Sequence, residues 1–251
     1  MSTTTSKQAK TALVTGASGR LGKLIAKRLT ELGFSVMVHS RDRDRAGDTA
    51  EEIGCDWHVG GDVAHWMVVE DIQRAVRTCF GNKLGLIVHN ASSFVTDNSG
   101  APSWSTFANA MSTAGWVYSL NLALEKPLCD GHGVSLALTD NATQDAWGQF
   151  IAHGAAKSAI EAMQSHFDAT FAGDCSGKTP IRCVSLRLPT VLAPNNTSNP
   201  DRLQRMYGKF QDTDDAVDAI VKFGTNRHHA NSLYAYKGDG HTAMILEERQ
   251  R

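Results

Sequence analysis

The chain of 251 residues is long enough for one large α/β domain or two smaller domains, and it needs no disulfide bonds to hold a core. Lysine plus arginine (25) nearly balances aspartate plus glutamate (26), so the composition indicates neither a nucleic-acid partner nor an anionic membrane surface. No apolar run approaches the roughly 18–20 residues of a membrane span, and the N-terminal segment Ser2-Thr-Thr-Thr-Ser-Lys7 lacks the apolar core of a secretion signal. The five cysteines form no CxxC pair, and together these features lead us to expect a cytoplasmic protein with reduced thiols.

Short apolar runs alternate with amphipathic stretches along the chain. The apolar runs predict strands at residues 12–14, 35–39, 55–59, 84–88, 134–138, 181–188 and 233–236. The amphipathic stretches predict helices at residues 21–32, 49–53, 68–80 and 106–125, and a further helix whose core face runs from residue 156 to residue 171. This alternation predicts a single-domain Rossmann fold of the α/β class, with helices on both faces of a doubly wound parallel β-sheet of about seven strands.

We expect one domain over residues 1–251, because no linker, internal repeat or low-complexity segment divides the chain. Residues 1–9 are expected to be disordered. The segment from Pro189 to Pro200 is rich in Asn and Pro, which is typical of a loop rather than of a domain boundary.

A glycine-spaced turn joins the first predicted strand to the first predicted helix. It reads Thr15-Gly-Ala-Ser-Gly-Arg-Leu-Gly22. In this context the backbone N–H groups of the turn approach a pyrophosphate, and the helix N-terminus favours its negative charge. The turn therefore predicts a dinucleotide site. The contacting residues are expected to be Gly16, Ser18, Gly19, Arg20, Leu21 and Gly22.

The end of the second predicted strand indicates which dinucleotide binds. An acidic residue is usual there in NAD-binding folds, whereas this chain has His39, Ser40 and Arg41. An arginine pairs with a 2′-phosphate, which a carboxylate would repel. The pattern favours NADP(H), with Arg20 as a second cation. The alternative is a solvated basic loop, in which acidic residues alternate with the arginines.

Asp62 and Val63 follow the third predicted strand, where they are expected to contact the adenine end of the cofactor. Asp62 can accept a hydrogen bond from an adenine amino group. The alternative is that Asp62 caps the following helix. The histidines show no metal-ligand spacing, so we expect no metal site.

With these features the chain resembles the short-chain dehydrogenase/reductase family over nearly its whole length. The motifs that carry the resemblance are the glycine turn, Asp62-Val63, Asn90-Ala91, Asn121 and Lys157, in that order. The resemblance implies that Asn90, Ala91 and Ser92 contact the cofactor and that Lys157 binds the nicotinamide ribose. It also implies that Asn121 holds a water that leads to the lysine, the alternative being that it satisfies a helix irregularity.

Within this family the chain is most similar to the pteridine reductases and the bacterial dihydromonapterin reductases. Arg20 replaces the middle glycine of the turn, the fourth strand runs into Asn90-Ala-Ser-Ser-Phe94, and the fifth ends in Thr139-Asp140, where most members have a serine. The resemblance implies that Ser92, Phe94 and Asp140 line the substrate site and that Phe94 stacks on a flat ring. Phe94 as a loop anchor is the alternative. Residues 189–210 would then cover the substrate as a loop or helix.

The chain departs from the family at the catalytic tyrosine. The family pattern Tyr-x-x-x-Lys reads His153-Gly-Ala-Ala-Lys157 here, and Asp140 lies thirteen residues before His153. A spacing of four places both side chains on one helical face. Either His153 is the general acid, or Asp140 or a water it holds donates the proton while His153 orients it. The remaining interpretation is that catalysis is lost or diverted and His153 only fills space.

The first hypothesis is an NADPH-dependent reductase of a C=N or C=O bond in a flat, pterin-like heterocycle, with Asp140, His153, Lys157 and Asn121 as its catalytic residues. The second is an NADP(H)-binding protein without hydride transfer, such as a regulator or a cyclase. The third is a simple ketone reductase. The resemblance implies a homo-oligomer, a tetramer or dimer, with a small-molecule substrate and no membrane or nucleic-acid partner.

Overall fold

The computed structural model describes residues 8–93, 103–143, 150–174, 181–188, 213–226, 232–236 and 243–245. The strands are β1 (Thr11–Val14), β2 (Ser35–Ser40), β3 (Trp57–Gly60), β4 (Leu86–His89), β5 (Val134–Asp140), β6 (Arg182–Leu188), β7 (Leu233–Tyr236) and β8 (Ala243–Ile245). The helices are α1 (Arg20–Glu31), α2 (Arg43–Ile53), α3 (Trp66–Phe80), α4 (Trp104–Ala123), α5 (Glu125–Gly131), α6 (Ile151–Asp174) and α8 (Thr213–Gly224), with a 3₁₀ turn η1 (Asn141–Thr143).

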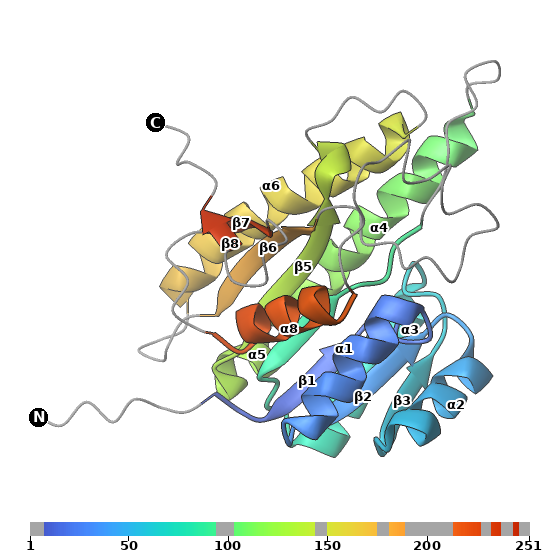
Figure 1. The fold of residues 1–251 in the computed structure, drawn as a ribbon, viewed down its shortest axis with the longest axis vertical. Coiled ribbons are helices and arrows are strands. Elements are labelled where there is room, and N and C mark those ends of the chain that lie inside the picture. The colour runs from blue at the N-terminus through green and yellow to red at the C-terminus, as the bar shows by residue number, and fades with distance from the viewer. Residues whose placement is uncertain are drawn as a thin grey trace, which may run out of the picture.

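The strands form one sheet in the order β3-β2-β1-β4-β5-β6-β7-β8 (Figure 1). All pairs from β3 to β7 are parallel, and β8 runs antiparallel to β7. The predicted Rossmann fold with seven parallel strands is therefore confirmed, while the short antiparallel edge strand was not predicted. The strand order reverses between β1 and β4, the switch point at which such sheets bind ligands beyond the carboxyl ends of their strands.

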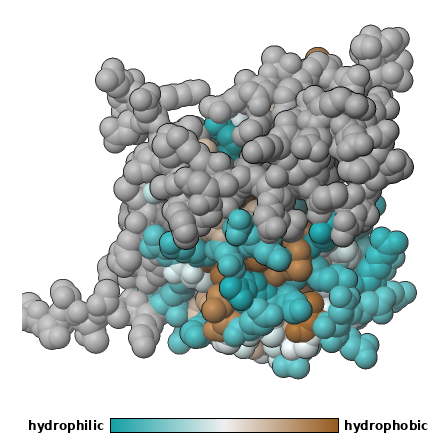
Figure 2. All heavy atoms as spheres, viewed as in Figure 1, coloured by the Kyte–Doolittle hydropathy of each residue, from teal (hydrophilic) through white to brown (hydrophobic). Residues whose placement is uncertain are grey.

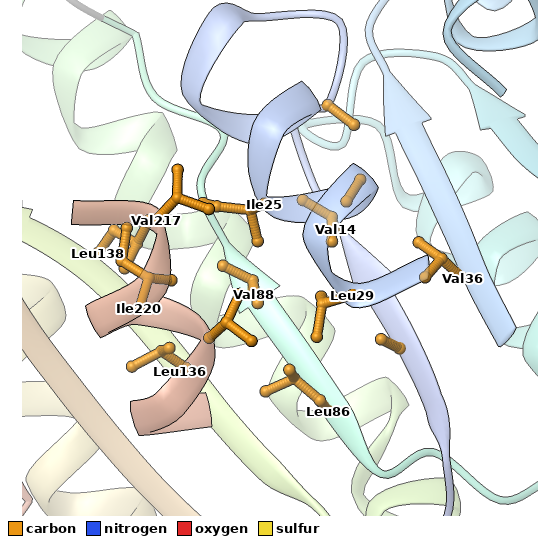
Figure 3. Close-up of a cluster of buried hydrophobic side chains, with 14 of the residues drawn as sticks. Val14, Ile25, Leu29, Val36, Leu86, Val88, Leu136, Leu138, Val217 and Ile220 are labelled. Carbon is orange, nitrogen blue, oxygen red and sulfur yellow. The ribbon is translucent and has the colours of Figure 1, made fainter. Parts of the chain in front are cut away.

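Helices α1 and α8 cover one face of the sheet. Figure 3 shows Ile25 of α1 and Val217 and Ile220 of α8 pointing at strand residues such as Val88 and Leu136. The opposite face packs against α3, α4 and α6 in a second apolar cluster. Because both faces are covered, the central strands are continuous apolar runs rather than alternating ones.

Two helix boundaries differ from the sequence-based expectation. Helix α2 begins at Arg43 rather than near residue 49, because the side chain of Asp42 accepts a hydrogen bond from the Arg45 N–H and caps it. The long helix after β4 divides into α4 and α5 because Pro127 has no N–H to donate to the Ala123 carbonyl. The Gln73 amide donates to that carbonyl instead, at 2.7 Å.

Gln8 and Ala9, the first residues that the structure describes, are bonded to the rest of the fold. The Gln8 amide donates to the Gly85 carbonyl, and the Ala9 N–H donates to the Gly131 carbonyl. Residues 1–7 and the segment 189–210 lie outside the described residues, so the expected disorder of residues 1–9 and the expected role of 189–210 over the substrate stay predictions.

The described surface in Figure 2 is mostly hydrophilic, with scattered hydrophobic side chains. No helix in the described part of the chain combines the length and apolarity needed to cross a membrane.

Candidate active site at the carboxyl edge of the sheet

The glycine turn between β1 and α1 is closely packed. Gly16 has a φ of 65°, and a Cβ added there would lie 2.8 Å from the Ala91 Cα. A Cβ on Gly22 would lie 2.5 Å from the Gly16 carbonyl oxygen and 2.6 Å from Asn90 Nδ2. Both positions exclude any side chain, so the sequence spacing reflects a steric requirement of the turn.

The residues after β4 hold this turn in place. Asn90 Nδ2 donates to the carbonyl oxygens of Thr15 and Gly16, at 3.0 and 3.1 Å. The Thr15 hydroxyl accepts from the N–H groups of Asn90 and Ala91, each at 3.1 Å. The structure thus brings Asn90 and Ala91 to the glycine turn, and their expected contact with the cofactor stays a prediction.

The N-terminus of α1 has the character of an anion site. Its N-cap, Gly19, makes no side-chain capping bond, and the first turn holds no acidic residue. The N–H groups of Arg20, Leu21 and Gly22 belong to the helix positions that lack an intrahelical acceptor. They and the helix dipole favour a negatively charged group at this point.

The end of β2 lies beside the same turn. The hydroxyls of Ser18 and Ser40 are 2.8 Å apart, and the Ala17 N–H donates to the His39 carbonyl at 2.8 Å. Arg20, two residues after Ser18, and Arg41, directly after Ser40, are both exposed. The carboxylate of Asp42 caps α2, and the alternative of a solvated basic loop stays open.

His39 and Val63 were both predicted to contact the cofactor, but their side chains are buried. His39 is buried, its Nε2 donates to the Gly61 carbonyl at 2.8 Å, and burial lowers its pKa. Val63 packs in the core against α3. Only the backbone of His39 therefore reaches the glycine turn, because the two-residue period of β2 directs its ring inward. Asp62 accepts from the Ala64 N–H at 2.9 Å in the turn before α3, whose N-cap is His65, so the Asp62 side chain does not cap that helix.

The end of β5 holds a partly buried carboxylate–imidazole pair. His153 Nε2 lies 2.7 Å from Asp140 Oδ2, and the other carboxylate oxygen accepts from the Ala142 N–H at 3.0 Å. The His153 side chain is 4% exposed and that of Asp140 is 29% exposed. Burial raises the pKa of Asp140, but the bond from His153, the charge of Lys157 and the Ala142 N–H outweigh it and leave the pKa below its ordinary value. Asp140 is therefore a carboxylate that accepts a hydrogen bond from Nε2.

Gly154 allows α6 to approach η1 closely beside this pair, because a Cβ there would lie 2.6 Å from the Ala142 carbonyl oxygen. Gly154→Ala is expected to destabilise the fold by about 1–3 kcal/mol through overpacking. Gly115→Ala is the matched control: Gly115 is an exposed glycine of α4 with no atom within 4 Å of an added Cβ, so alanine there should stabilise by about 0.5–1 kcal/mol. Thermal unfolding of both variants tests this; equal melting temperatures would contradict the close contact.

Lys157 lies one turn after His153 on the same face of α6. Its Nζ donates to the Leu138 carbonyl of β5 at 3.0 Å, and the residue is 7% exposed. Burial lowers the pKa of Lys157, while the charges of Asp140 and Glu161 oppose that shift. The spacing of four thus places both residues at the end of β5, as predicted.

A second buried charge pair continues along α6. Glu161 accepts two hydrogen bonds from Arg187 of β6 and one from the Thr139 hydroxyl. The sequence analysis missed this pair. The available signal was the position of Glu161, which continues the polar positions of His153 and Lys157 along α6 at an interval of four residues.

The structure places Asn121 in a buried polar network. Its Oδ1 accepts from the Ser135 hydroxyl at 2.7 Å and from His89 Nε2 at 3.1 Å, and its Nδ2 donates to Gln164 at 2.7 Å. Burial lowers the pKa of His89 to about 4, so its ring is neutral. The side chain of Asn121 makes no bond to Lys157 within the described residues, and it braces α4 against β4, β5 and α6.

The predicted substrate side is described in part. Ser92 is exposed after β4, and the next residue, Ser93, donates its N–H to the Thr113 hydroxyl of α4 at 3.0 Å. Phe94 lies outside the described residues. Among the residues that the structure covers, no group of three or more His, Cys, Asp or Glu side chains is arranged to hold a metal ion.

Comparisons with known sequences agree with this geometry. A family model described as short chain dehydrogenase matches residues 10–203. An uncharacterized oxidoreductase of Staphylococcus epidermidis is 26% identical over 227 residues, which cover 88% of this chain and 94% of the relative. A similar oxidoreductase of Staphylococcus haemolyticus is 27% identical over 228 residues, with the same coverage of 88% and 94%.

Solved structures share the fold at low identity. A Serratia marcescens short-chain dehydrogenase/reductase mutant superposes with a TM-score of 0.79 at 17% identity, covering 93% of this chain and 98% of its own. An NADPH dependent reductase involved in bacilysin biosynthesis gives 0.78 at 14%, covering 95% and 100%. An alcohol dehydrogenase from Thermococcus sibiricus, complexed with 5-hydroxy-NADP, gives 0.74 at 20%, covering 95% and 100%.

Proposed function

Since the chain belongs to the short-chain dehydrogenase/reductase family and is an oxidoreductase of that type, we propose that it is an NADPH-dependent reductase of a C=N or C=O bond in a flat, pterin-like heterocycle. The observation that carries the proposal is the Asp140–His153 pair. It lies next to a buried lysine at the carboxyl edge of the sheet, where a nicotinamide and a substrate would meet.

The residues present fit a nicotinamide dinucleotide. The glycine turn leaves no room for a Cβ at Gly16 or Gly22, and the N-terminus of α1 carries no acidic residue or side-chain cap that would compete with a pyrophosphate. Lys157 would hold the nicotinamide ribose. The bound nicotinamide would supply the hydride, and the protein would supply the proton and the orientation of both reactants.

The hydroxyls of Ser18 and Ser40, together with Arg41, support NADPH over NADH. Hydroxyls and a guanidinium suit a 2′-phosphate, and the carboxylate that would repel it is absent from the end of β2. Two structures of the same fold, a reductase described as NADPH dependent and a dehydrogenase with bound 5-hydroxy-NADP, agree with this preference.

Arg41→Ala is expected to raise the Kd of NADPH about 10- to 100-fold, because it removes a charge-assisted bond of about 1.5–3 kcal/mol, and to leave the Kd of NADH unchanged. Fluorescence titration with each cofactor measures both constants. Arg74→Ala, which removes an exposed arginine of α3, is the control and should change neither. An equal loss for both cofactors in Arg41→Ala would remove Arg41 from the phosphate site.

The exposures of the pair suggest how the proton is delivered. Asp140 is the more exposed partner and His153 is buried behind it. We infer that the transferred proton starts on a protonated His153, which gives it to the Asp140 carboxylate through the 2.7 Å bond as negative charge develops on the substrate. Asp140 passes a proton on to the substrate, directly or through a water that it holds, so the pair loses one proton for each hydride transferred.

The replacement of the family tyrosine by His153 favours a second candidate, an NADP(H)-binding protein without hydride transfer. NADPH consumption against oxidised and dihydro pterins, with simple ketones alongside, separates the candidates. Turnover confined to pterins supports the reductase proposed here, and turnover of simple ketones alone supports an ordinary ketone reductase. Tight NADPH binding without oxidation of NADPH by any compound supports the second candidate.

We also propose a cytoplasmic homo-oligomer, a dimer or tetramer. The family resemblance supports it, as do the large exposed apolar side chains of α4, which include Trp104, Tyr118 and Leu122.

A further inference from the structure

The Glu161–Arg187 pair plays no part in the chemistry proposed above. Arg187 Nε lies 3.0 Å from Glu161 Oε1, and Nη2 lies 2.6 Å from Oε2. The two side chains are 6% and 9% exposed. We propose that this pair is a positioning unit for Lys157, which keeps the lysine charged and in place at the cofactor side of α6. The inference rests on the proposed function, because that function gives Lys157 its role in cofactor binding.

The pair is connected to the reacting end of β5. Glu161 Oε1 also accepts from the Thr139 hydroxyl at 2.7 Å, and Thr139 directly precedes Asp140. Thr139 and Arg187 are register partners on β5 and β6. One carboxylate therefore ties α6 to both strands, one helical turn beyond Lys157.

The charges at this interface alternate in sign. They run from Asp140 through Lys157 and Glu161 to Arg187, so each buried charge has an opposite neighbour, as buried charges require. The charges of Asp140 from β5 and Glu161 from α6 act on Lys157, while His153 of α6 is bonded to Asp140 and Arg187 of β6 is bonded to Glu161. Helix α4 and η1, which also pack against α6, carry no charged residue. Burial lowers the pKa of Lys157, and the charges of Asp140 and Glu161 raise it.

Stability alone does not account for the pair. Replacing a buried ion pair with apolar residues of similar volume is often neutral or stabilising. Among the residues that the structure describes, this pair is also incompletely satisfied, because Arg187 Nη1 is buried and has no hydrogen-bond partner there. An apolar replacement of Glu161 and Arg187 would remove the negative charge of Glu161, which lies one helical turn from Lys157.

The direct test is the titration of Lys157, observed by NMR in protein with ¹³C-labelled lysine, with the signal assigned by Lys157→Met. Glu161→Gln keeps the size of the side chain and removes its charge, so the titration midpoint should fall by about one to three pH units. Arg187→Met removes a positive charge and should move the midpoint upward. Midpoint shifts of opposite sign in Glu161→Gln and Arg187→Met are expected only if the two charges act on Lys157 electrostatically. Loss of packing would not give the two variants shifts of opposite sign.

Asp168→Asn is the matched control. Asp168 and Arg182 join the same two elements, α6 and β6, with the same two-bond geometry at 2.9 and 3.0 Å, but far along α6 from Lys157. In the Asp168→Asn variant, the titration midpoint of Lys157 should equal that of the wild type. Should Glu161→Gln not fold, the double variant Glu161→Leu/Arg187→Met, which leaves no unpaired charge, replaces it and should still lower the midpoint. A midpoint unchanged in the folded variant, or shifted equally by Asp168→Asn, would overturn the proposal.

NADPH titration of the same proteins separates this inference from the proposed function. Glu161→Gln should weaken NADPH binding at a pH above its lowered midpoint and bind normally below it. A wild-type protein that does not bind NADPH would contradict the proposed function, whereas the Lys157 midpoints would still support or overturn the positioning role.

Discussion

Asp140→Asn is expected to lower kcat by about 10²- to 10⁴-fold, the range that a general acid contributes, while the Kd of NADPH stays within a few fold. Asparagine keeps the shape of the side chain and can still accept from the Ala142 N–H and from His153. It cannot receive the His153 proton and pass it on. Steady-state kinetics with a compound that the wild-type protein reduces measure kcat, and a separate NADPH titration measures the Kd.

The control for this variant is Asp168→Asn, which alters a carboxylate of the same helix away from the reacting end and should leave kcat unchanged. The double variant Asp140→Asn/His153→Asn should be hardly slower than Asp140→Asn alone, because residues that act as one unit are not additive. Turnover that survives Asp140→Asn at the wild-type rate would exclude Asp140 from proton transfer.

Gly22→Ala is expected to weaken NADPH binding about 10- to 100-fold and to destabilise the protein, since overpacking costs about 1–3 kcal/mol. Its Cβ would lie 2.5 Å from the Gly16 carbonyl oxygen and 2.6 Å from Asn90 Nδ2. The turn must then move away from Asn90, whose Nδ2 donates to the Thr15 and Gly16 carbonyls. The N–H groups at the start of α1 would lose their position. NADPH titration and thermal unfolding measure the two effects.

Gly115→Ala is again the appropriate comparison, because it adds the same methyl group where nothing lies within 4 Å. It should bind NADPH as the wild type does. A Gly22→Ala protein with unchanged NADPH affinity would show that the glycine turn is not the phosphate site.

The fold could be predicted because its main elements have recognisable local sequence patterns. Buried strands such as β4 and β5 are short apolar runs, and the glycine turn between β1 and α1 has its own spacing. The start of α2, the break at Pro127 and the edge strand β8 depend on a cap, a missing N–H and a sheet edge, which apolar periodicity does not report.

The candidate site was predictable where it follows helical spacing. His153 and Lys157 lie on one face of α6, and the thirteen-residue separation brings Asp140 within 2.7 Å of His153. The Glu161–Arg187 pair was missed because it depends on the register of β5 and β6, which no local pattern reveals. The inward direction of the His39 ring likewise follows from the pleat of β2 rather than from its position at the strand end.

The most direct test of the reductase is to follow the hydride itself. The protein would be incubated with NADPH deuterated at nicotinamide C4 and with the pterin panel, and the products analysed by mass spectrometry. Reduction by the proposed route predicts a product that carries one deuterium at the reduced carbon, formed together with NADP⁺. A product without deuterium, or bound NADPH that remains unconsumed with every compound, would contradict hydride transfer at this site.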